Sequence, residues 1–181
     1  MRLHEWIFET LAWRQQQGLE GGVRNADSDV VQAASQNIGA YVMGRKMFGG
    51  GAGPWDGSWK GWWGDDPPYH VPVFVLSHHP REPLNMRGGT TFSFVGGGAE
   101  AALEQARYAA GGKDVLIAGG ASTIRQYLAA GKLDELYLHI VPVLLGSGER
   151  LLEGAGDPVL EPVEVVASPA VTHVRYRIHH R

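Results

Sequence analysis

The sequence predicts an α/β domain with a mainly parallel sheet, and two observations carry this prediction. Short β-branched or aromatic runs alternate along the chain with segments of helical periodicity. Several of these runs lead straight into a helical segment, which is typical of strand-to-helix connections in parallel sheets. With 181 residues, 44% hydrophobic and 19% charged, the chain has the composition of one globular domain spanning residues 1–181.

The composition limits the classes of function. Cysteine is absent, which excludes disulfides, thiolate catalysis and zinc–thiolate sites and fits a reducing, cytoplasmic compartment. The formal net charge is −3 and no run of five like charges occurs, so the charge does not indicate binding to nucleic acid or membranes. The apolar runs are too short to span a bilayer, and no signal-peptide pattern begins at Met1.

Helical periodicity identifies several segments of the chain. They are residues 3–17, 29–38, 99–110 and 122–130, with a further helical turn over residues 45–48. Asp27 or Ser28 would cap the second helix, and Gly39 would end it. Gly131 would follow the last helix in the left-handed conformation that glycine tolerates best.

Strands are indicated by short runs that are rich in β-branched and aromatic residues. They are residues 41–44, 71–77, 90–95, 114–120 (a strand followed by a turn), 133–146 and 171–180. The last run, VTHVRYRIHH, alternates between apolar and polar residues. It is therefore expected to be the C-terminal strand of the domain.

The longest segment without either period is GGGAGPWDGSWKGWWGDDPPYH, residues 49–70. A loop of this length inside a compact domain is usually functional or mobile. Its four tryptophans argue against a solvated, disordered linker. They suit either a lid over a flat heterocycle or a contact between two subunits.

The junction IAGGAST, where a strand ends in two glycines and a helix begins, is a candidate phosphate site. Glycine lets the backbone approach a ligand closely, and the first turn of a helix offers unpaired N–H groups at its positive end. The residues concerned are Gly119, Gly120, Ala121, Ser122 and Thr123. The alternative is that the two glycines only permit a tight turn. The run VGGGAE, residues 95–100, is a second candidate seat, although Glu100 adds a carboxylate there.

Two further strand ends carry polar residues. In VMGRKMF, Arg45 and Lys46 open a helical turn at its positive end, where an anionic ligand would explain two cations. The alternative is that both side chains point into solvent. In VLSHHP, Ser77, His78 and His79 close a strand. Three polar strand ends in one α/β sheet predict a nucleotide with several phosphates.

These motifs, VMGRKMF, PVFVLSHHPREPL and IAGGASTIRQYLAAGKLDELYLHIVPVLLGSGERLL, resemble the dihydrofolate-reductase-like family that includes the C-terminal reductase domain of bacterial riboflavin biosynthesis. The resemblance runs from about residue 27 to the end of the chain. It implies an NADPH-dependent reductase of a pteridine- or pyrimidine-like ring, with a twisted, mostly parallel sheet flanked by helices, an antiparallel C-terminal strand and a homodimeric assembly. Dihydrofolate reductases usually carry threonine where Met47 stands, so one phosphate-binding hydroxyl is missing here.

The resemblance also implies which residues bind the cofactor. Gly44, Arg45 and Lys46 would hold cofactor phosphate, and Ser77 and His78 would lie by the adenosine. The pyrophosphate would be clasped by the residues of the Gly-Gly junction: Gly119, Gly120, Ala121, Ser122 and Thr123.

Hydride transfer to a ring needs a proton source or a hydrogen-bonding anchor near the acceptor nitrogen. Dihydrofolate reductases use one carboxylate on the helix before the MGR strand, and comparable spacing leads here to Asp29 or Asp27. The alternative is that both acids only stabilise a helix N-terminus. Asp65 and Asp66, in the tryptophan-rich segment, are further candidates. No metal site is expected, because adjacent histidines on a strand point to opposite faces.

Members of the resembled family normally begin with a strand of the type SLDGFIAG, whereas this chain begins in what looks like the following segment. That strand ordinarily lies centrally in the sheet, and a gap there would leave two rows of unpaired backbone groups. We therefore expect direct pairing of the neighbouring strands, strand exchange between subunits, or filling by a partner. The alternative function is a non-catalytic nucleotide-binding or assembly protein that keeps the fold without the activity.

Overall fold

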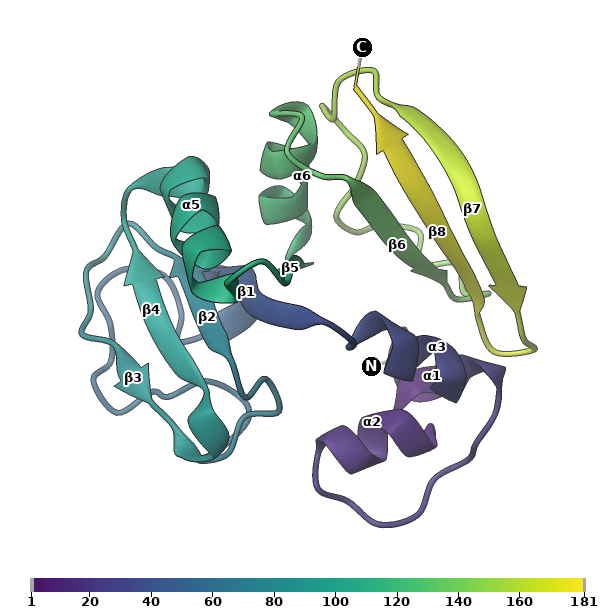
Figure 1. The fold of residues 1–181 in the computed structure, drawn as a ribbon, viewed down its shortest axis with the longest axis horizontal. Helices are drawn as coiled ribbons and strands as arrows, with labels where there is room; N and C mark the ends of the chain where they lie inside the picture. The colour runs from purple at the N-terminus through teal and green to yellow at the C-terminus, as the bar shows by residue number, and fades with distance from the viewer. Residues whose placement is uncertain (1, 181) are drawn as a thin grey trace. The chain divides into compact units, whose positions relative to one another are not determined.

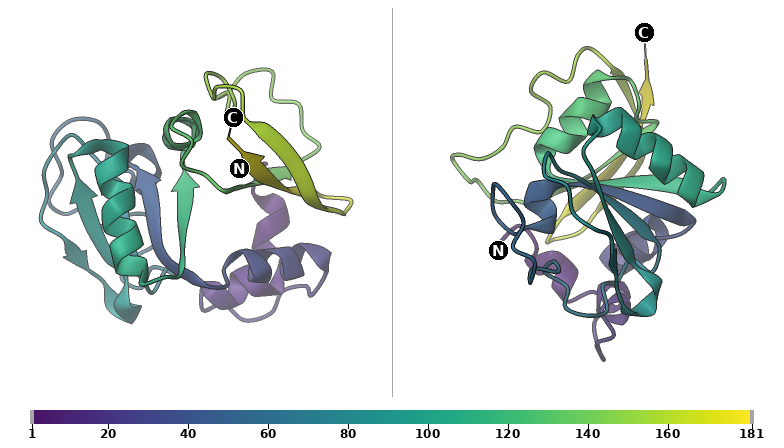
Figure 2. Two further views of the ribbon diagram at one scale, coloured as in Figure 1. Left: turned by 45° about the horizontal axis from the view of Figure 1, so that its top comes forward. Right: turned by 90° about the vertical axis from the view of Figure 1, so that its left-hand side faces the viewer.

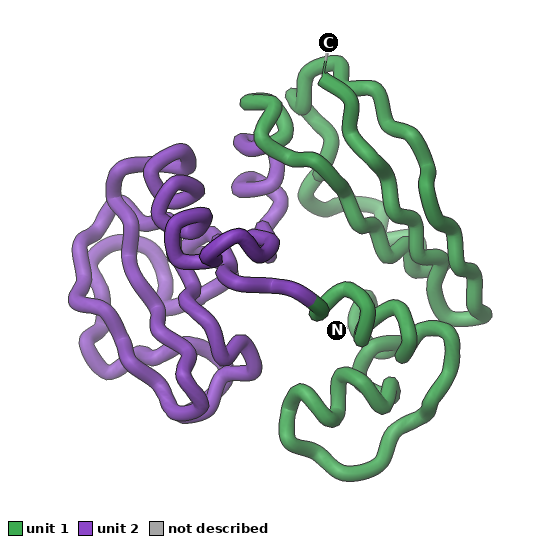
Figure 3. The backbone as a smooth tube through the Cα atoms, viewed as in Figure 1, with its two compact units in different colours: residues 1–36, 128–181 green, residues 37–127 purple. Residues whose placement is uncertain are grey.

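The computed structural model describes residues 2–180, which group into two compact units (Figure 3). Unit 2 comprises Asn37–Tyr127, and unit 1 combines the described residues of Met1–Gln36 and Leu128–Arg181. The single domain over residues 1–181 stays a prediction. No helix within residues 2–180 is both long and apolar enough to cross a membrane.

Unit 2 is built on a five-stranded sheet with the strand order β3-β4-β2-β1-β5 (Figure 1). The strands are β1 (Ile38–Gly44), β2 (Pro72–Leu76), β3 (Leu84–Asn85), β4 (Thr91–Val95) and β5 (Asp114–Gly119). Strand β1 pairs in parallel with β2 and β5, and β2 pairs in parallel with β4. Only the short edge strand β3 is antiparallel to its neighbour. The predicted mainly parallel sheet is therefore confirmed.

Each helical segment of unit 2 follows a strand along the chain. These segments are α4 (Arg45–Phe48), a 3-10 turn (Arg87–Gly89), α5 (Gly98–Ala110) and α6 (Ala121–Ala129), whose last residues belong to unit 1. Helix α5 lies along one face of β1 and β2 (Figures 1 and 2). Its buried residues are mostly alanine, and small side chains let a helix approach a sheet closely. The predicted helix over residues 99–110 is confirmed to within one residue.

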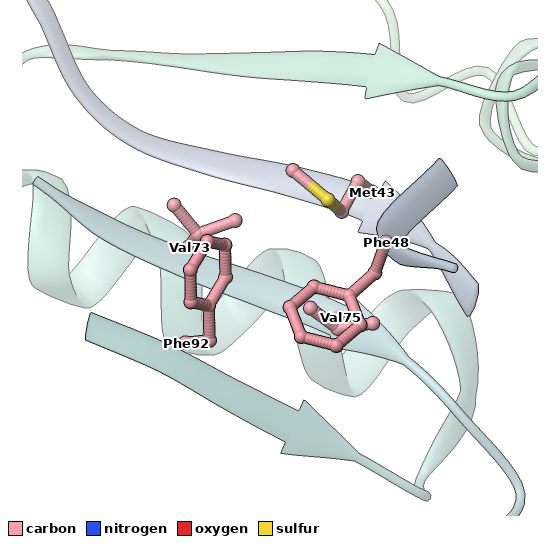
Figure 4. Packing of buried hydrophobic residues seen from close by; sticks show 5 residues of the cluster. All are labelled: Met43, Phe48, Val73, Val75 and Phe92. Atoms are coloured by element: carbon pink, nitrogen blue, oxygen red, sulfur yellow. The ribbon is translucent and has the colours of Figure 1, made fainter. Parts of the chain in front are cut away.

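The tryptophan-rich segment, residues 49–70, contains no helix or strand, as predicted. It is nevertheless tied to the core of unit 2. On the face of the sheet away from α5, five fully buried residues form a cluster (Figure 4): Met43, Phe48, Val73, Val75 and Phe92. Trp55, Trp59 and Trp63 pack against this cluster. Burial of these rings therefore helps to hold the segment on the sheet, together with the hydrogen bonds that the indole N–H groups of Trp55 and Trp59 donate to the carbonyls of His79 and Phe48.

Unit 1 begins with three short helices: α1 (Glu5–Phe8), α2 (Leu11–Gln16) and α3 (Ala26–Ala34). The prediction of one helix over residues 3–17 is therefore wrong. The helical conformation is interrupted at Thr10, which has an extended backbone. The Thr10 side chain caps α2 by accepting a hydrogen bond from the Trp13 amide. Thr10 also forms a bridge with Val23, and the Leu11 amide donates to the Val23 carbonyl. This tertiary pairing outweighs the helical pattern of the local sequence.

The second predicted helix also needs correction at both ends. Helix α3 is capped by Asn25, which accepts a hydrogen bond from the Ser28 amide, and not by Asp27 or Ser28. It ends at Ala34, and Gly39 lies inside β1 rather than ending a helix. A Cβ atom at position 39 would lie 2.6 Å from the Ala110 carbonyl oxygen, so glycine is needed there for close packing against the end of α5.

The C-terminal part of unit 1 is a three-stranded antiparallel sheet with the order β6-β8-β7. The strands are β6 (Glu135–Ile140), β7 (Val159–Ala167) and β8 (Thr172–His179). The predicted C-terminal strand is confirmed, but the strand predicted over residues 133–146 ends at Ile140. A turn follows, in which the Val143 amide donates to the Val141 carbonyl. Strand β7 was not predicted, because Pro162 interrupts its pattern.

Strands β5 and β6 each form the edge of a sheet. Strand β5 belongs to unit 2 and β6 to unit 1, and direct pairing of neighbouring strands stays a prediction. Their outer edges carry backbone groups that are open to pairing. Strand exchange between subunits and filling by a partner stay predictions.

Candidate functional site

The carboxyl ends of β1 and β5 bring two of the predicted phosphate motifs together in unit 2. Met43 on β1 is paired with Gly119 on β5, so Gly44 and Gly120 continue from adjacent strand ends. A Cβ atom at Gly44 would collide with the Thr123 hydroxyl and would lie 3.7 Å from the Gly120 amide nitrogen. Two motifs separated by about 75 residues of sequence thus share one edge of the sheet, as ligand sites in open α/β sheets do.

The Gly-Gly junction opens helix α6. The peptide bond between Gly119 and Gly120 is cis, and Gly119 has φ 118°, a conformation that side chains rarely adopt. The Gly120 carbonyl accepts hydrogen bonds from the amides of Thr123 and Ile124 at 2.9 and 3.1 Å. Gly120 and Ser122 are exposed, whereas Thr123 is buried beside Gly44. The exposed first turn keeps donors for an anion, while the Thr123 hydroxyl fits between the two strand ends.

Because this packing leaves no room at position 44, Gly44→Ala should lower the free energy of unfolding by about 1–3 kcal/mol. Removing the hydroxyl with Thr123→Ala should recover much of this loss in the double variant, since the two sites then no longer clash. Urea denaturation of the two single variants and the double variant measures the coupling. Additive losses would show that Gly44 and Thr123 do not share this space.

Arg45 connects the second and third predicted strand ends. Its guanidinium donates to the Ser77 hydroxyl at 3.3 Å and to the carbonyls of Gly50 and Gly53 at 3.4 and 3.1 Å. Arg45 therefore reaches from α4 to the end of β2 and also fixes the start of the tryptophan-rich segment. Of the neighbouring predicted residues, Lys46 and His78 are exposed.

Arg81, which the sequence reading did not single out, stands beside Arg45. The guanidinium carbon of Arg45 lies 3.1 Å from the centroid of the Trp55 ring, and that of Arg81 lies 5.1 Å from it. Burial, and the nearby charge of Arg81, lower the pKa of Arg45. Within the described residues, Arg45 Nε and Arg81 Nη1 are buried without a hydrogen-bond partner. Two like charges with unused donors form a site that an anion would satisfy.

The candidate carboxylates occupy different surroundings. Asp27, on α3, is 4% exposed, and its Oδ1 atom accepts a hydrogen bond from Nε2 of His173 at 3.1 Å. Asp29, two residues further along the same helix, is exposed and lines a small open pocket with Arg24 and Gln15. Asp27 is therefore more than a helix-capping acid, because a buried carboxylate needs a specific partner.

The other two acids lie in unit 2 and are exposed. Asp65 is 3.7 Å from the Arg87 guanidinium, and Asp66 is 3.9 Å from the His70 ring. These exposed pairs contribute little to stability. Among the described residues, no contact links either acid to the strand ends that carry Arg45 and the Gly-Gly junction.

The partner of Asp27 leads to a second histidine. Nδ1 of His173, on β8, is 2.7 Å from Nδ1 of His139, its cross-strand neighbour on β6. Trp6 of α1 packs against both rings, with centroids 4.9 and 5.2 Å apart. Burial, and then the neighbouring His173, lower the pKa of His139 to about 4. Sequence reasoning missed both histidines, although each interrupts an otherwise apolar or alternating strand, in LYLHI and VTHVRY.

A mostly parallel sheet flanked by helices, together with an antiparallel sheet at the C-terminal end, defines a dihydrofolate-reductase-like fold. The RibD C-terminal domain model matches residues 7–174, and the chain belongs to that family. The comparison with curated proteins gave no match.

Solved structures with the same fold include three relatives of low sequence identity. A putative riboflavin biosynthesis protein from Shewanella sp. PV-4 is 24% identical, with a TM-score of 0.59 over 82% of this chain and 78% of that chain. A pyrimidine reductase-like protein from Corynebacterium diphtheriae is 13% identical, with a TM-score of 0.54 over 87% and 83%. A Thermotoga maritima diaminohydroxyphosphoribosylaminopyrimidine deaminase/5-amino-6-(5-phosphoribosylamino)uracil reductase is 14% identical, with a TM-score of 0.54. The match covers 90% of this chain and 52% of that chain.

Proposed function

We propose that the protein is an NADPH-dependent reductase that transfers a hydride to a pteridine- or pyrimidine-like heterocycle. Membership of the RibD C-terminal domain family supports a reductase of the riboflavin-pathway type. The observation that carries the nucleotide part is the pair of guanidinium groups, Arg45 and Arg81, that share Trp55 and keep buried, unpaired donors. An anionic ligand satisfies these donors and relieves the repulsion between the two cations.

The residues at the strand ends fit a phosphate-bearing cofactor. Arg45 would hold phosphate with Gly44 and Lys46, and Ser77 and His78 would contact the adenosine part. The junction residues would clasp the pyrophosphate: Gly119, Gly120, Ala121, Ser122 and Thr123. When bound, NADPH supplies the hydride. The residues at these strand ends would bind and orient the cofactor.

Asp29 is the carboxylate that we propose orients the ring of the substrate. It is exposed beside a small pocket, whereas Asp27 is buried against His173. An ionised carboxylate accepts hydrogen bonds from ring N–H groups, and this fixes the orientation of the ring for hydride transfer. The same proposal includes a homodimer in the cytoplasm, a compartment that suits a chain without cysteine.

The separate sheets favour a second candidate function. Because β5 and β6 both have open edges, a nucleotide-binding protein that assembles with a partner strand and performs no reduction is the alternative. Titration with NADPH, followed by cofactor fluorescence, separates the two functions when it is combined with assays of NADPH oxidation by pterins and pyrimidines. Tight binding without oxidation supports the assembly protein. Absence of NADPH binding contradicts both.

Arg45→Ala should weaken NADPH binding by about 10- to 100-fold, the value of a charge-assisted hydrogen bond to phosphate. NADH, which lacks the extra phosphate, should lose less affinity. Fluorescence titration of both cofactors measures the difference. Arg107→Ala, which removes an exposed arginine of α5, is the matched control and should change neither affinity. An equal loss for NADPH and NADH would contradict the role of Arg45 at that phosphate.

A further inference from the structure

A chain of hydrogen-bonding groups runs from the interior of unit 1 to its surface. Asp27 of α3 and His173 of β8 are each 4% exposed and lie 3.1 Å apart, from Oδ1 to Nε2. His139 of β6 continues the chain through the 2.7 Å contact between the two Nδ1 atoms, and it is exposed. In Figure 1, α1 and α3 lie at the end of the sheet where β6 finishes and β8 begins.

The number of protons in this chain fixes the direction of each hydrogen bond. A carboxylate only accepts, so Nε2 of His173 donates to Asp27. A neutral His173 then has an unprotonated Nδ1, which must accept the proton carried by Nδ1 of His139. A neutral His139 is consequently unprotonated at Nε2. Of the four ring nitrogens of the two histidines, Nε2 of the exposed His139 is therefore the one that remains as an unused acceptor.

The surroundings of His139 indicate that its Nε2 atom is available to a ligand and is not enclosed in a polar core. Within residues 2–180, Nε2 of His139 has no hydrogen-bond partner, and Trp6 covers the ring from α1. Arg175, on the same face of β8, is paired with Glu135 and Glu164. The other acids of α1 and α3, Glu5 and Asp29, are exposed. Asp27 is thus the only carboxylate that the described contacts place in the chain.

We propose that Asp27, His173 and His139 form a proton relay, an acid–base site whose outer end is Nε2 of His139 and whose ligand is a small molecule with an O–H or N–H group. The ligand gives its proton to Nε2 of His139, while the Nδ1 proton of His139 moves to Nδ1 of His173. His173 becomes an imidazolium ion beside the Asp27 carboxylate, and the ligand is left as its conjugate base. The reverse transfer returns the proton. Asp27 and His173 are positioning residues, and the relay lies within unit 1, so it does not depend on NADPH binding.

Electrostatics place the added charge on His173. Partial burial of the ring, and then the adjacent His173, lower the pKa of His139 to about 4, so a positive charge on this ring is unfavourable. The Asp27 carboxylate compensates a charge on His173 directly. A proton accepted at the surface is thus stored one residue further inside.

Nitrogen-15 NMR of the full chain labelled at histidine tests the relay, since it reports the tautomer and charge of each ring. At neutral pH we expect His139 to carry its proton on Nδ1 and His173 on Nε2. On acidification His173 should become the imidazolium ion, while His139 switches to the Nε2–H tautomer. His139→Gln and His173→Gln assign the signals. Protonation of His139 on Nε2 at neutral pH, or no switch before unfolding, would overturn the relay.

Asp27→Asn should lower the midpoint of this titration by about one pH unit, a tenfold loss of proton affinity, because the compensating charge is removed. Asp29→Asn, two residues along the same helix, is the matched control and should leave the midpoint unchanged. An unchanged midpoint in folded Asp27→Asn contradicts the relay. If that variant does not fold, the histidine tautomers measured in the unmodified chain still test the relay.

Chemical modification tests whether the outer end is accessible. Diethylpyrocarbonate acylates unprotonated imidazole nitrogens, and mass spectrometry of peptides identifies the site. His139 should react at a rate comparable with that of the exposed His78, which lies outside the cluster. Protection of His139 while His78 reacts would show that the cluster is purely structural, and would leave the reductase proposal untouched.

Discussion

Phe48→Ala should lower the free energy of unfolding by about 3–5 kcal/mol, the usual cost of deleting a fully buried aromatic ring. Phe48 is 0% exposed and makes ring contacts with Trp55 and Trp63 from the tryptophan-rich segment and with Phe92 and Phe94 from β4 (Figure 4 shows its place in the cluster). Its loss opens a cavity and removes the surface on which the segment packs. Against a typical total stability of about 5–15 kcal/mol, the effect is large.

Circular dichroism in urea measures this loss without interference from the changed tryptophan fluorescence. Tyr108→Ala is the matched control, because Tyr108 is an aromatic residue that is 92% exposed, and its removal should cost no more than about 0.5 kcal/mol. NADPH affinity should fall in Phe48→Ala as well, since Phe48 belongs to the same helical turn as Arg45. A loss of stability below about 1 kcal/mol would contradict the central role of Phe48 in unit 2.

The parts of the fold that local patterns determine were predictable. Helix α5, the parallel strands and the C-terminal strand follow from periodicity and β-branched runs, and the structure confirms them. The predicted helix boundaries are wrong where a contact with a residue distant in the sequence determines the local structure. Thr10 ends a helix because it pairs with Val23, and Gly39 lies in a strand because it packs against Ala110. Neither partner can be identified from the residues next to the error.

The same distinction applies to the candidate site. Glycines at strand ends are visible in the sequence, so Gly44 and the Gly-Gly junction could be singled out, and the structure brings them together. Asp27 was also singled out, but as an acid facing a ligand. Its actual neighbour, His173, is 146 residues away in the sequence. Arg81 was missed for a similar reason, since its relation to Arg45 depends on the folding of the tryptophan-rich segment around Trp55.

The histidine pair should make the protein sensitive to acid over a defined range. Folding lowers the pKa of His139 from its ordinary value of 6.5 to about 4, so between these values the unfolded chain binds more protons than the folded one. The free energy of unfolding should therefore fall as the pH decreases from about 6.5 to about 4. Uptake of one proton limits the loss to about 1.4 kcal/mol per pH unit, and partial exposure of His139 reduces it below that limit.

The contact between the two rings explains why protonation of both His173 and His139 is unfavourable. The two Nδ1 atoms are 2.7 Å apart and share one hydrogen, so protonating both rings places two donors against each other and breaks the contact. His139→Gln removes the titrating ring and should flatten the pH dependence of urea denaturation across this range. His78→Gln, an exposed histidine outside the cluster, should leave the dependence as it is. Equal acid sensitivity of His139→Gln and the unmodified chain would mean that other groups, and not this pair, govern stability below neutral pH.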